Sequence, residues 1–378
     1  MRKIYLFTFM MLLLVHLKGQ AQQITLHVER AGTLHGMINA SRLPYITDLK
    51  LTGELNGTDI SFIRTLVKKN LRFLDLSEAR IVEGGAIYYS NYRTSNDIIG
   101  SYMFYNPDYS PISPCAISKI NLPNSVTGIE EGAFKSCTRL TDINIPNSVT
   151  SIGPETFKSC TSLTDINIPN SVTSIGERAF SGCTSLTDIN IPNSVTSIGG
   201  GAFSGCTSLT DINIPNSVTS IERSTFYSCT GLTSINIPGS VTTIGSNAFY
   251  SCTSLTDINI PNSVTSIGEQ AFYNCDNLKS VYMNASTPPF IGSQAFHNIS
   301  KDLTIYIPRG SYTAYWLSYW GNYNLVEYDP TDIQGVTTSA HNGVEKYFSI
   351  DGRPLPGPCK GVNIIQDTDG KTRKAWIP

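Results

Sequence analysis

The sequence is poor in the groups on which most enzyme chemistry depends. Charged residues make up only 15% of the 378 positions, and the five histidines stand in no metal-binding or nucleophile-activating pattern. Glycine-rich phosphate loops and Cys-x-x-Cys pairs are absent, and carboxylates recur only as a repeated column instead of as a pair in one cleft. We therefore expect no catalytic residue, no metal site and no cofactor.

The chain also lacks a basic run and a stretch long enough to cross a membrane. Its formal net charge is -2 and no cluster of Lys and Arg stands out, which argues against a nucleic acid as partner. The longest apolar stretch, Ile4 to Val15, is too short to span a bilayer. It follows two basic residues and precedes the small-residue site at 19–21, which predicts an export signal peptide over residues 1–21.

Cysteine is absent from the first part of the chain. The first cysteine is Cys115, so no acceptor for a bacterial lipid anchor lies near the predicted cleavage site. We therefore expect an exported protein that is released into the periplasm or beyond, with an extracellular or outer cell-surface location.

What the sequence has in abundance is one repeated stretch. Leu163 to Ser185, LTDINIPNSVTSIGERAFSGCTS, recurs with small changes seven times over residues 117–277. A fixed period of roughly 20 to 50 residues is typical of a solenoid, in which each repeat contacts mainly its neighbours. The cysteine of the repeat returns every 23 residues without insertion or deletion, at Cys137, Cys160, Cys183, Cys206, Cys229, Cys252 and Cys275.

The alternation within one copy predicts which side chains face the core. Leu163, Ile166 and Ile168 are expected to point inward from a strand, which leaves Asp165 and Asn167 pointing outward. A second short extended segment and then a tight helical or irregular arc follow, and Gly176 is expected to let the chain bend between them. The further inward positions are Val172, Ile175, Ala179, Phe180 and Cys183.

Less regular segments flank this block. Residues 22–116 are expected to form an N-terminal cap with irregular repeats, with strands near 24–28 and 46–51, a small helix near 33–39, a helix over 59–69 and the leucine-rich spacing of Leu71, Leu74 and Leu76. Residues 278–329 are expected to form a degenerate repeat, in which Ile299 or Asn298 replaces the cysteine, and a C-terminal cap. The predicted remainder is a linker over 330–345 and a small β-rich module over 346–378.

Aromatic residues in the C-terminal cap recur at helical spacing. This pattern suits a closing helix that acts as a hydrophobic lid, and a grip on a ligand is the alternative. The residues are Tyr312, Tyr315, Trp316, Tyr319, Trp320 and Tyr323.

The repeat LTDINIPNSVTSIGERAFSGC resembles the BspA-like leucine-rich repeat family, known mainly from cell-surface and secreted proteins of Bacteroides-type bacteria and from some protozoa. The resemblance covers about residues 46–328. It implies an α/β-type repeat solenoid, a leucine-rich repeat array without catalytic activity, and adhesion to host proteins or other cells. The segment from Tyr347 to Pro378 resembles short C-terminal modules of exported proteins, some of which are sorting signals for an outer-membrane secretion system.

The cysteine column admits more than one interpretation. Stacked repeats bring neighbouring Cα atoms to about 5 Å, within the window for a disulfide, but parallel side chains make poor disulfide geometry. Cysteine also behaves as a small buried hydrophobe. A buried ladder of free thiols is the favoured interpretation, and some disulfides or a metal site are the alternatives.

Two outward columns are candidate contact surfaces. The acidic column starts after Lys119 and is interrupted by Ser234, and like charges about 5 Å apart repel by about 0.8 kcal/mol in water and about 3 kcal/mol at an effective dielectric constant of 20. It is either a solvated face or a site for calcium or a basic ligand. The candidate residues are Asp142, Asp165, Asp188, Asp211 and Asp257 with Asn144, Asn167, Asn190, Asn213, Asn236 and Asn259.

The residue after the repeated phenylalanine varies between otherwise similar copies. It is Lys135, Lys158, Ser181, Ser204, Tyr227, Tyr250 and Tyr273 in successive copies. The three stacked tyrosines are a candidate strip for binding a sugar or a protein, and ordinary surface variation is the alternative.

Two classes of function are compatible with these patterns. The first is a secreted or cell-surface binding solenoid, expected to be a monomer, whose strand face engages host extracellular or microbial surface proteins or glycans. The alternative is a structural or self-assembling surface protein without a soluble ligand, because nearly identical repeats make a poor unique site but a good lattice.

Overall fold

The computed structural model describes residues 22–105 and 115–329 and the strands of the C-terminal module. The predicted signal peptide and the linker over 330–345 lie outside the described residues. The chain divides into two compact units. Unit 1 comprises residues up to Lys279 and Pro289–Asp302, and unit 2 comprises Ser280–Pro288 and the residues from Leu303 onward.

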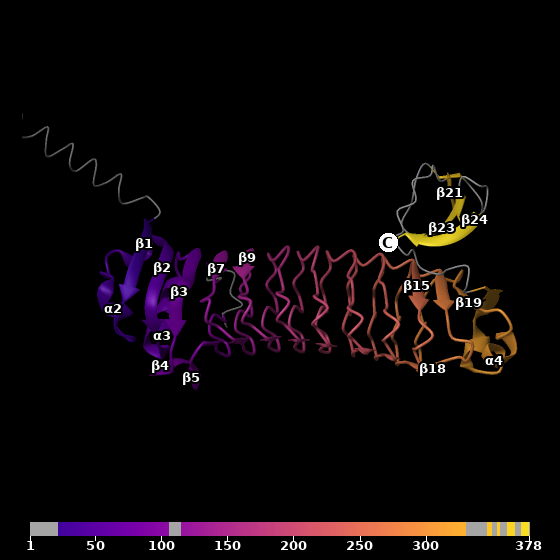
Figure 1. Ribbon diagram of the computed structural model, residues 1–378, viewed down its shortest axis with the longest axis horizontal. Helices are drawn as coiled ribbons and strands as arrows, with labels where there is room; N and C mark the ends of the chain where they lie inside the picture. Colours follow the sequence, from indigo (N-terminus) through magenta and orange to yellow (C-terminus); the bar gives the residue numbers. More distant parts are fainter. Residues whose placement is uncertain are drawn as a thin grey trace, which may run out of the picture. The chain divides into compact units, whose positions relative to one another are not determined.

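The N-terminal part of unit 1 contains the long strands and the longest helix of the described chain (Figure 1). Helix α3 (Gly57–Val67) is preceded by its N-cap, Asn56, whose side chain accepts the Thr58 N–H at 3.0 Å while Asp59 accepts the Asn56 N–H, a capping box. The elements are β1 (Gln22–Val28), α2 (Leu34–Met37), η1 (Leu43–Tyr45), β2 (Ile46–Leu55), α3 (Gly57–Val67), β3 (Phe73–Ile81), β4 (Gly84–Tyr89) and β5 (Tyr92–Thr94). These positions confirm the strands and helices predicted for the cap.

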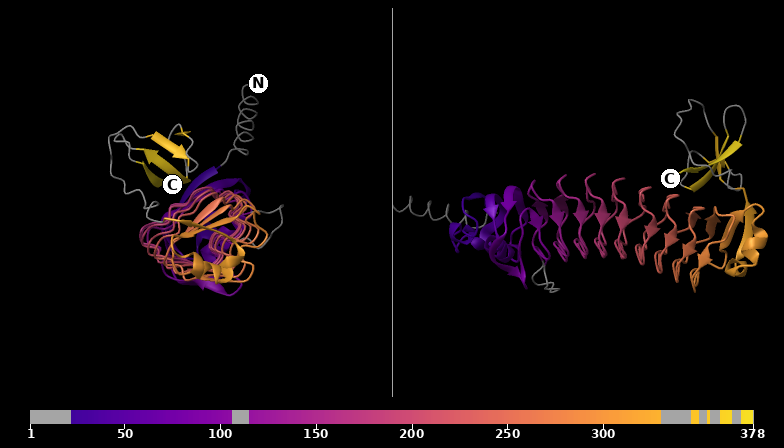
Figure 2. Two further views of the ribbon diagram at one scale, coloured as in Figure 1. Left: turned by 90° about the vertical axis from the view of Figure 1, so that its right-hand side faces the viewer. Right: turned by 60° about the horizontal axis from the view of Figure 1, so that its bottom comes forward.

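The regular repeats form rungs joined by two rows of short parallel strands (Figures 1 and 2). The pairs Ile120↔Ile143 and Ile152↔Ile175 are each one 23-residue period apart, which confirms the predicted solenoid. The first row contains β7 (Lys119–Asn121), β9 (Asp142–Asn144), the isolated bridges Asn167↔Asn190 and Asn213↔Asn236, and β15 (Asp257–Ile260). The second row contains β6 (Ile98–Ile99), β8 (Gly128–Ile129), β10 (Ser151–Ile152), β11 (Ser174–Ile175), β12 (Ser197–Ile198), β13 (Ser220–Ile221), β14 (Thr243–Ile244), β16 (Ser266–Ile267) and β18 (Phe290–Ile291).

The arc that closes each rung is a run of turns and not a helix. Its N–H groups alternate between a carbonyl in the same rung and one in the next: Cys160 donates to Phe157 O at 3.0 Å, whereas Phe157 donates to Ala179 O at 2.7 Å. Residues with positive φ, such as Arg178 (54°) and Ser228 (56°), recur at two places in each arc. A left-handed residue interrupts helical hydrogen bonding, so the irregular one of the two predicted forms is present.

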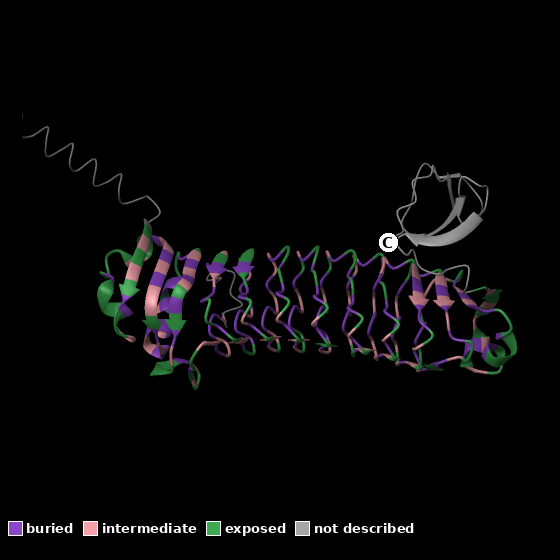
Figure 3. Cartoon of the chain, viewed as in Figure 1, coloured by how far each residue is buried: buried purple, intermediate pink, exposed green. Residues whose placement is uncertain are grey.

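The core of the array is a stack of phenylalanine rings. Each ring lies parallel to the ring of the next rung, with centroids 4.8 to 5.8 Å apart and interplanar angles of 2 to 14°. Figure 3 shows buried residues recurring at the same places in successive rungs. The rings belong to Phe104, Phe134, Phe157, Phe180, Phe203, Phe226, Phe249, Phe272 and Phe296. The inward positions predicted from the Leu163 copy are all buried.

The cysteine column is a buried ladder of free thiols, as predicted. All eight cysteines of the described residues are free and buried. The thiol of Cys183 donates to Phe157 O at 3.1 Å, and the same contact recurs from Cys137 to Cys275 at 3.1 to 3.3 Å. Each thiol therefore serves as a polar link between two rungs as well as a small core side chain.

Gly176 has a different role from the one expected of it. A Cβ atom on Gly176 would lie 2.5 Å from Pro154 N and 2.6 Å from Gly153 C. The glycine thus permits a close approach of two rungs, and its φ is not positive.

Unit 2 contains the degenerate strand and the C-terminal cap. Strands β17 (Ser280–Met283), β19 (Thr304–Pro308) and β20 (Asn324–Tyr328) are parallel neighbours, and the module that follows is an antiparallel sheet in the order β22-β21-β23-β24. The remaining elements are α4 (Tyr312–Trp316), η2 (Tyr319–Asn322), β21 (Lys346–Ser349), β22 (Pro354–Leu355), β23 (Gly361–Gln366) and β24 (Thr372–Ile377). No helix within the described residues is long and apolar enough to cross a membrane.

The prediction of one closing helix from Tyr312 to Tyr323 is wrong in its length. Helix α4 ends after Trp316, and a separate 3-10 turn, η2, follows. Tyr315 and Trp320 are buried, and Tyr315 donates its hydroxyl to Ala285 O at 2.8 Å. Ser318 caps η2 by accepting the Trp320 N–H, which ends the first helix and starts the second.

We predict that Ser228→Gly raises the free energy of unfolding by roughly 0.5 to 1 kcal/mol, because glycine adopts the left-handed backbone of Ser228 without a Cβ penalty. Gly205 occupies the same place two residues after its Phe, with φ 74°, and has no atom closer than 3.7 Å to a built Cβ. Gly205→Ser is therefore the reverse control and is expected to destabilise. Urea unfolding of both variants measures the two shifts, and equal signs would contradict the strain argument.

We predict that thiol reagents label few of the buried cysteines before denaturation and most of them afterwards. Burial raises the pKa of Cys183, Cys229 and Cys275 from 9.0 to about 12. Between these values the unfolded chain releases thiol protons and the folded chain does not, so stability is intact below pH 9.0 and is lost as pH rises toward about 12.

Cys229→Val provides the control for that pH dependence. It removes one titrating thiol, and its alkaline loss of stability should be smaller than that of the parent by up to about 1.4 kcal/mol per pH unit. Full labelling of the native protein, or identical alkaline profiles for parent and variant, would contradict the buried-thiol assignment.

Candidate functional site

The acidic and asparagine columns lie on the strand face of the first row, as the alternation predicts. Asp142, Asp165, Asp188 and Asp211 are exposed, and Asp257 is half-buried. The asparagines are similarly exposed except Asn259, which is half-buried. The structure therefore places both columns on one accessible face of the rungs.

Local partners relieve part of the charge on this face. Lys119 Nζ lies 2.6 Å from an Asp142 carboxylate oxygen, so the basic residue of the first copy pairs with the first member of the acidic column. Thr164 and Thr256 donate their hydroxyls to Asp165 at 3.1 Å and to Asp257 at 2.8 Å. The Asn144 side chain accepts the Leu122 N–H at 2.8 Å, which ties it to the rung before.

The structure places no metal centre on this face. Among residues 22–105 and 115–329, no three or more His, Cys, Asp or Glu side chains gather closely enough to hold a metal ion. Calcium binding by the acidic column stays a hypothesis, and a calorimetric titration with calcium tests it.

A second surface, formed by the arcs, changes character along the array. At its N-terminal end Glu155 accepts hydrogen bonds from Lys135 at 2.5 Å and from Lys158 at 2.6 Å. Burial opposes ionisation of Glu155, but these two ammonium groups outweigh it and lower its pKa. Lys135 Nζ also lies 5.6 Å from the centroid of the Tyr105 ring. The basic positions of this column are thus paired within the protein.

Toward the C-terminal end the same column becomes an aromatic ladder, which we define as Tyr227, Tyr250, Tyr273 and His297. Successive ring centroids lie 4.8, 5.0 and 5.4 Å apart, with interplanar angles of 11, 8 and 27°. The structure therefore brings the three predicted tyrosines together. Burial by the stack, with the neighbouring phenols Tyr227 and Tyr273, raises the pKa of Tyr250.

Stacking decides which part of each ring a ligand meets. The inner rings cover one another's faces, so the ladder presents ring edges and phenol hydroxyls to solvent. In the described part of the chain, no group hydrogen-bonds to the hydroxyls of Tyr227, Tyr250 or Tyr273. The preceding rung has Ser204, which is too small to cover a ring, and Tyr227 is 37% exposed. The ladder thus has an open aromatic face at its Tyr227 end.

Two pairs of hydrogen-bonded amide side chains lie beside the aromatic ladder in the sequence of the rungs. Gln270 donates to Gln294 at 2.8 Å three residues before the ladder positions, and Asn298 donates to Asn274 at 2.5 Å one residue after them. His297 and these amides are not among the residues predicted from the sequence, although the degenerate repeat keeps Ile-Gly-x-x-Ala-Phe and its spacing places His297 directly after Phe296. Asn298 occupies the left-handed position next to the cysteine column, so Ile299 is the residue that replaces the cysteine.

Two rungs, which have Ser181 and Ser204 in this column, separate Lys158 from the aromatic ladder. In one of these rungs, Gly200 and Gly201 line a hollow of about 380 Å³ together with Glu177 and Arg178 of the rung before and Glu222 and Arg223 of the rung after. The arc surface is therefore divided into a paired charged region, a gap and an aromatic region, although the core beneath it changes little, with Thr156 and Thr225 in place of the usual alanine.

We predict that Asp188→Ser, which copies the natural Ser234 of this column, stabilises the protein by several tenths to about 1 kcal/mol at low ionic strength. The gain should shrink at high salt because exposed like charges are screened. Lys119→Ser should instead destabilise the protein, since it leaves Asp142 without its 2.6 Å partner. Thermal unfolding at two salt concentrations measures both effects, and a salt-independent shift would rule out charge repulsion as the cause.

Solved structures of leucine-rich repeat proteins are similar to this chain. One from T. pallidum is 33% identical over 42% of this chain and 71% of that chain, with a TM-score of 0.38. One from Bacteroides ovatus is 24% identical over 70% of this chain and 75% of that chain, with a TM-score of 0.47. The pneumococcal vaccine antigen PcpA is 15% identical over 68% of this chain and 89% of that chain, with a TM-score of 0.29. No curated protein matches the sequence.

The profile of one repeat family accounts for most of the array. The BspA type leucine rich repeat region matches residues 97–233 and 219–325, in six copies. This family is a repeat scaffold, and no catalytic family is indicated. The 23-residue rungs, their two rows of strands and this match together show that the chain belongs to the BspA-type leucine-rich repeat family.

Proposed function

We propose that this protein is a non-catalytic adhesin, exported to the cell surface or beyond, that binds a host or microbial surface protein or glycan through the aromatic ladder. The observation on which the proposal rests is the stacking of Tyr227, Tyr250 and Tyr273 into one continuous aromatic strip. Core residues are copied from rung to rung with few changes, whereas the residue after each phenylalanine changes from lysine through serine to tyrosine, and the two residues before each Ala-Phe or Thr-Phe pair change as well.

The chemistry of the ladder suits contact with a polar macromolecular surface. Tyrosine offers a large contact area with few rotatable bonds and a hydroxyl that both donates and accepts. The stack fixes the rings of Tyr250 and Tyr273 before any ligand arrives, which lowers the entropy lost on binding. The amide pairs that include Gln270 and Asn274 add hydrogen-bond donors and acceptors nearby.

Export and a surface location belong to the same proposal. They are supported by the sequence pattern of residues 1–21 and by the family, whose members include cell-surface proteins. The C-terminal module is proposed as a sorting signal on the basis of its resemblance alone.

Self-assembly is the second candidate function, favoured by one specific observation. Strand β1 pairs with β2 on one side and with no other strand among the described residues on its outer side. An open strand edge is a template for pairing with another chain. Light scattering distinguishes the two functions, because an adhesin of the proposed kind stays a monomer at all concentrations.

The proposed function predicts that the intact chain binds at least one member of an array of matrix proteins and glycans, and that Tyr250→Ser weakens the binding about tenfold or more. Serine is the natural residue of this column at Ser181 and Ser204, so the variant should keep its fold. Surface plasmon resonance with the partner found on the array measures the loss.

Asn213→Ser is the control, because it also introduces a serine, but on the exposed strand face. It should leave the affinity unchanged. If Asn213→Ser abolishes binding and Tyr250→Ser does not, the strand face is the contact surface and the assignment to the ladder is wrong. An array without any binding partner would contradict adhesion itself.

A further inference from the structure

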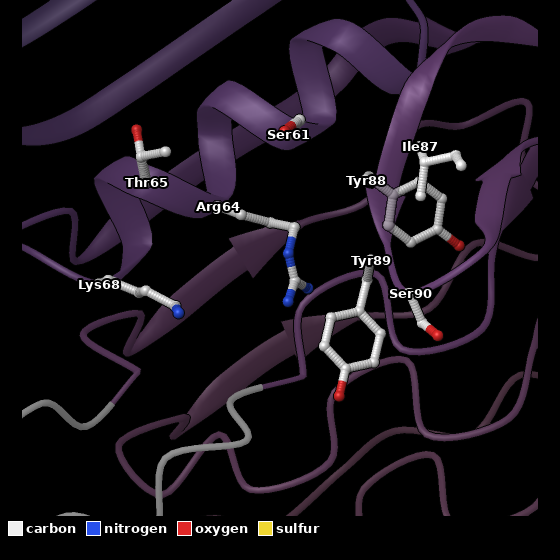
Figure 4. Close-up of a pocket in the computed structure, with 8 residues that line it drawn as sticks. All are labelled: Ser61, Arg64, Thr65, Lys68, Ile87, Tyr88, Tyr89 and Ser90. Carbon is white, nitrogen blue, oxygen red and sulfur yellow. The ribbon is translucent and has the colours of Figure 1, made fainter.

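A second hollow lies in the N-terminal part of unit 1, far along the sequence from the aromatic ladder. It has a volume of about 480 Å³, within the range usual for small-ligand sites. Helix α3 and its C-cap contribute Ser61, Arg64, Thr65 and Lys68, which lie on one helical face because they are three or four residues apart. Strand β4 and the next residue contribute Ile87, Tyr88, Tyr89 and Ser90 (Figure 4).

Arg64 is the unusual member of this lining. Its side chain is 9% exposed, yet its partners within the described residues are all uncharged. Nη1 donates to the carbonyls of Tyr102 at 2.8 Å and Met103 at 2.7 Å, and Cζ lies 4.8 Å from the centroid of the Tyr89 ring. A buried guanidinium normally has a carboxylate partner, because an unpaired buried charge is costly.

The two carbonyl contacts leave a particular edge of the guanidinium unused. Arginine has five N–H donors, and Nε and Nη2 together form the fork that binds a carboxylate with two parallel hydrogen bonds. Neither atom has a hydrogen-bond partner among the described residues, and neither is completely buried. Since Arg64 lines the hollow, a ligand there can reach this edge.

The other lining groups define the rest of the ligand. None of the eight lining residues is acidic. Ser61 has no hydrogen-bond partner in the described part of the chain, and Thr65 donates to Phe62 O but can still accept. Ile87 is 43% exposed and offers a small apolar surface. Such a lining combines anion recognition with hydroxyl partners and one apolar contact.

We propose that this hollow binds the carboxylate of an acidic sugar, with the Nε and Nη2 atoms of Arg64 holding the carboxylate and the hydroxyls around it pairing with the sugar hydroxyls. The site is separate from the aromatic ladder and goes beyond the adhesion proposed there. A simple acidic peptide side chain is a weaker match, because it would leave the hydroxyls of Ser61 and Thr65 without ligand partners.

Calorimetric titration of the intact chain with glucuronate, glucose and glutarate tests this assignment. Glucuronate is expected to bind about tenfold more tightly than either of the others, since glucose lacks the carboxylate and glutarate lacks the hydroxyls. Equal binding of glutarate would overturn the sugar assignment, and absence of glucuronate binding would overturn the site.

Two variants test whether glucuronate binds in the hollow lined by Arg64. Ser61→Asp places a carboxylate three residues before Arg64 on the helix, where it pairs with the guanidinium, stabilises the helix and should weaken glucuronate binding about tenfold or more. Lys69→Ala changes the net charge by the same amount outside the hollow and should leave binding unchanged. Equal losses in both variants would show a nonspecific charge effect and overturn the site.

Arg64→Lys is the more direct change, since it keeps the charge but removes the fork. It also alters the contacts to Tyr102 and Met103, so Ser61→Asp remains decisive if Arg64→Lys does not fold. Tyr250→Ser should leave glucuronate binding unchanged. This result would separate a failure at the aromatic ladder from a failure at the Arg64 hollow.

Discussion

Hydrogen bonds between successive rungs are the constraint on which unit 1 depends. On the second row of strands each rung donates backward, as from Thr173 N to Thr150 O at 2.9 Å. On the arc it donates forward, as from Phe180 N to Ala202 O at 2.8 Å. Because a single rung cannot satisfy its own backbone, every rung requires neighbours on both sides, and equal spacing follows from this requirement.

The spacing has opposite consequences for the core and for the surface. It brings identical side chains to about the distance between strands, near 4.8 Å. For phenylalanine and tyrosine this distance is stabilising, because their rings stack on one another. Charged groups of the same sign repel one another at this distance. Ion pairs between residues of opposite sign offset part of this repulsion, as between Lys119 and Asp142 or between Lys135 and Glu155. The surface of a repeat array is therefore restricted to columns that tolerate their own repetition.

Much of the array could be predicted from one copy of the repeat. Alternation at Leu163, Ile166 and Ile168 identified the inward face, and the fixed period identified the stack. The stacking of Tyr227 and Tyr250 also followed, because equal positions in successive rungs must be neighbours. Such predictions succeed where a side chain's surroundings are copies of its own sequence.

The remaining features depend on contacts that no local pattern encodes. Arg178 and Ser228 adopt left-handed conformations because their N–H groups must reach the next rung, and their side chains give no sign of it. The break after Trp316 depends on the cap made by Ser318. Arg64 looks like an ordinary helix residue, and its burial follows from the distant Tyr102 turn that packs against it.

The uninterrupted 23-residue period has an evolutionary consequence. Where every rung presents the same two faces to its neighbours, removing or duplicating one whole rung leaves each remaining junction intact and the end caps unaltered. Copies of the repeat can then be gained or lost one at a time, and each resulting length still satisfies its junctions. The length of the molecule, and with it the reach of the surface that it displays, is a heritable trait that can change in single steps.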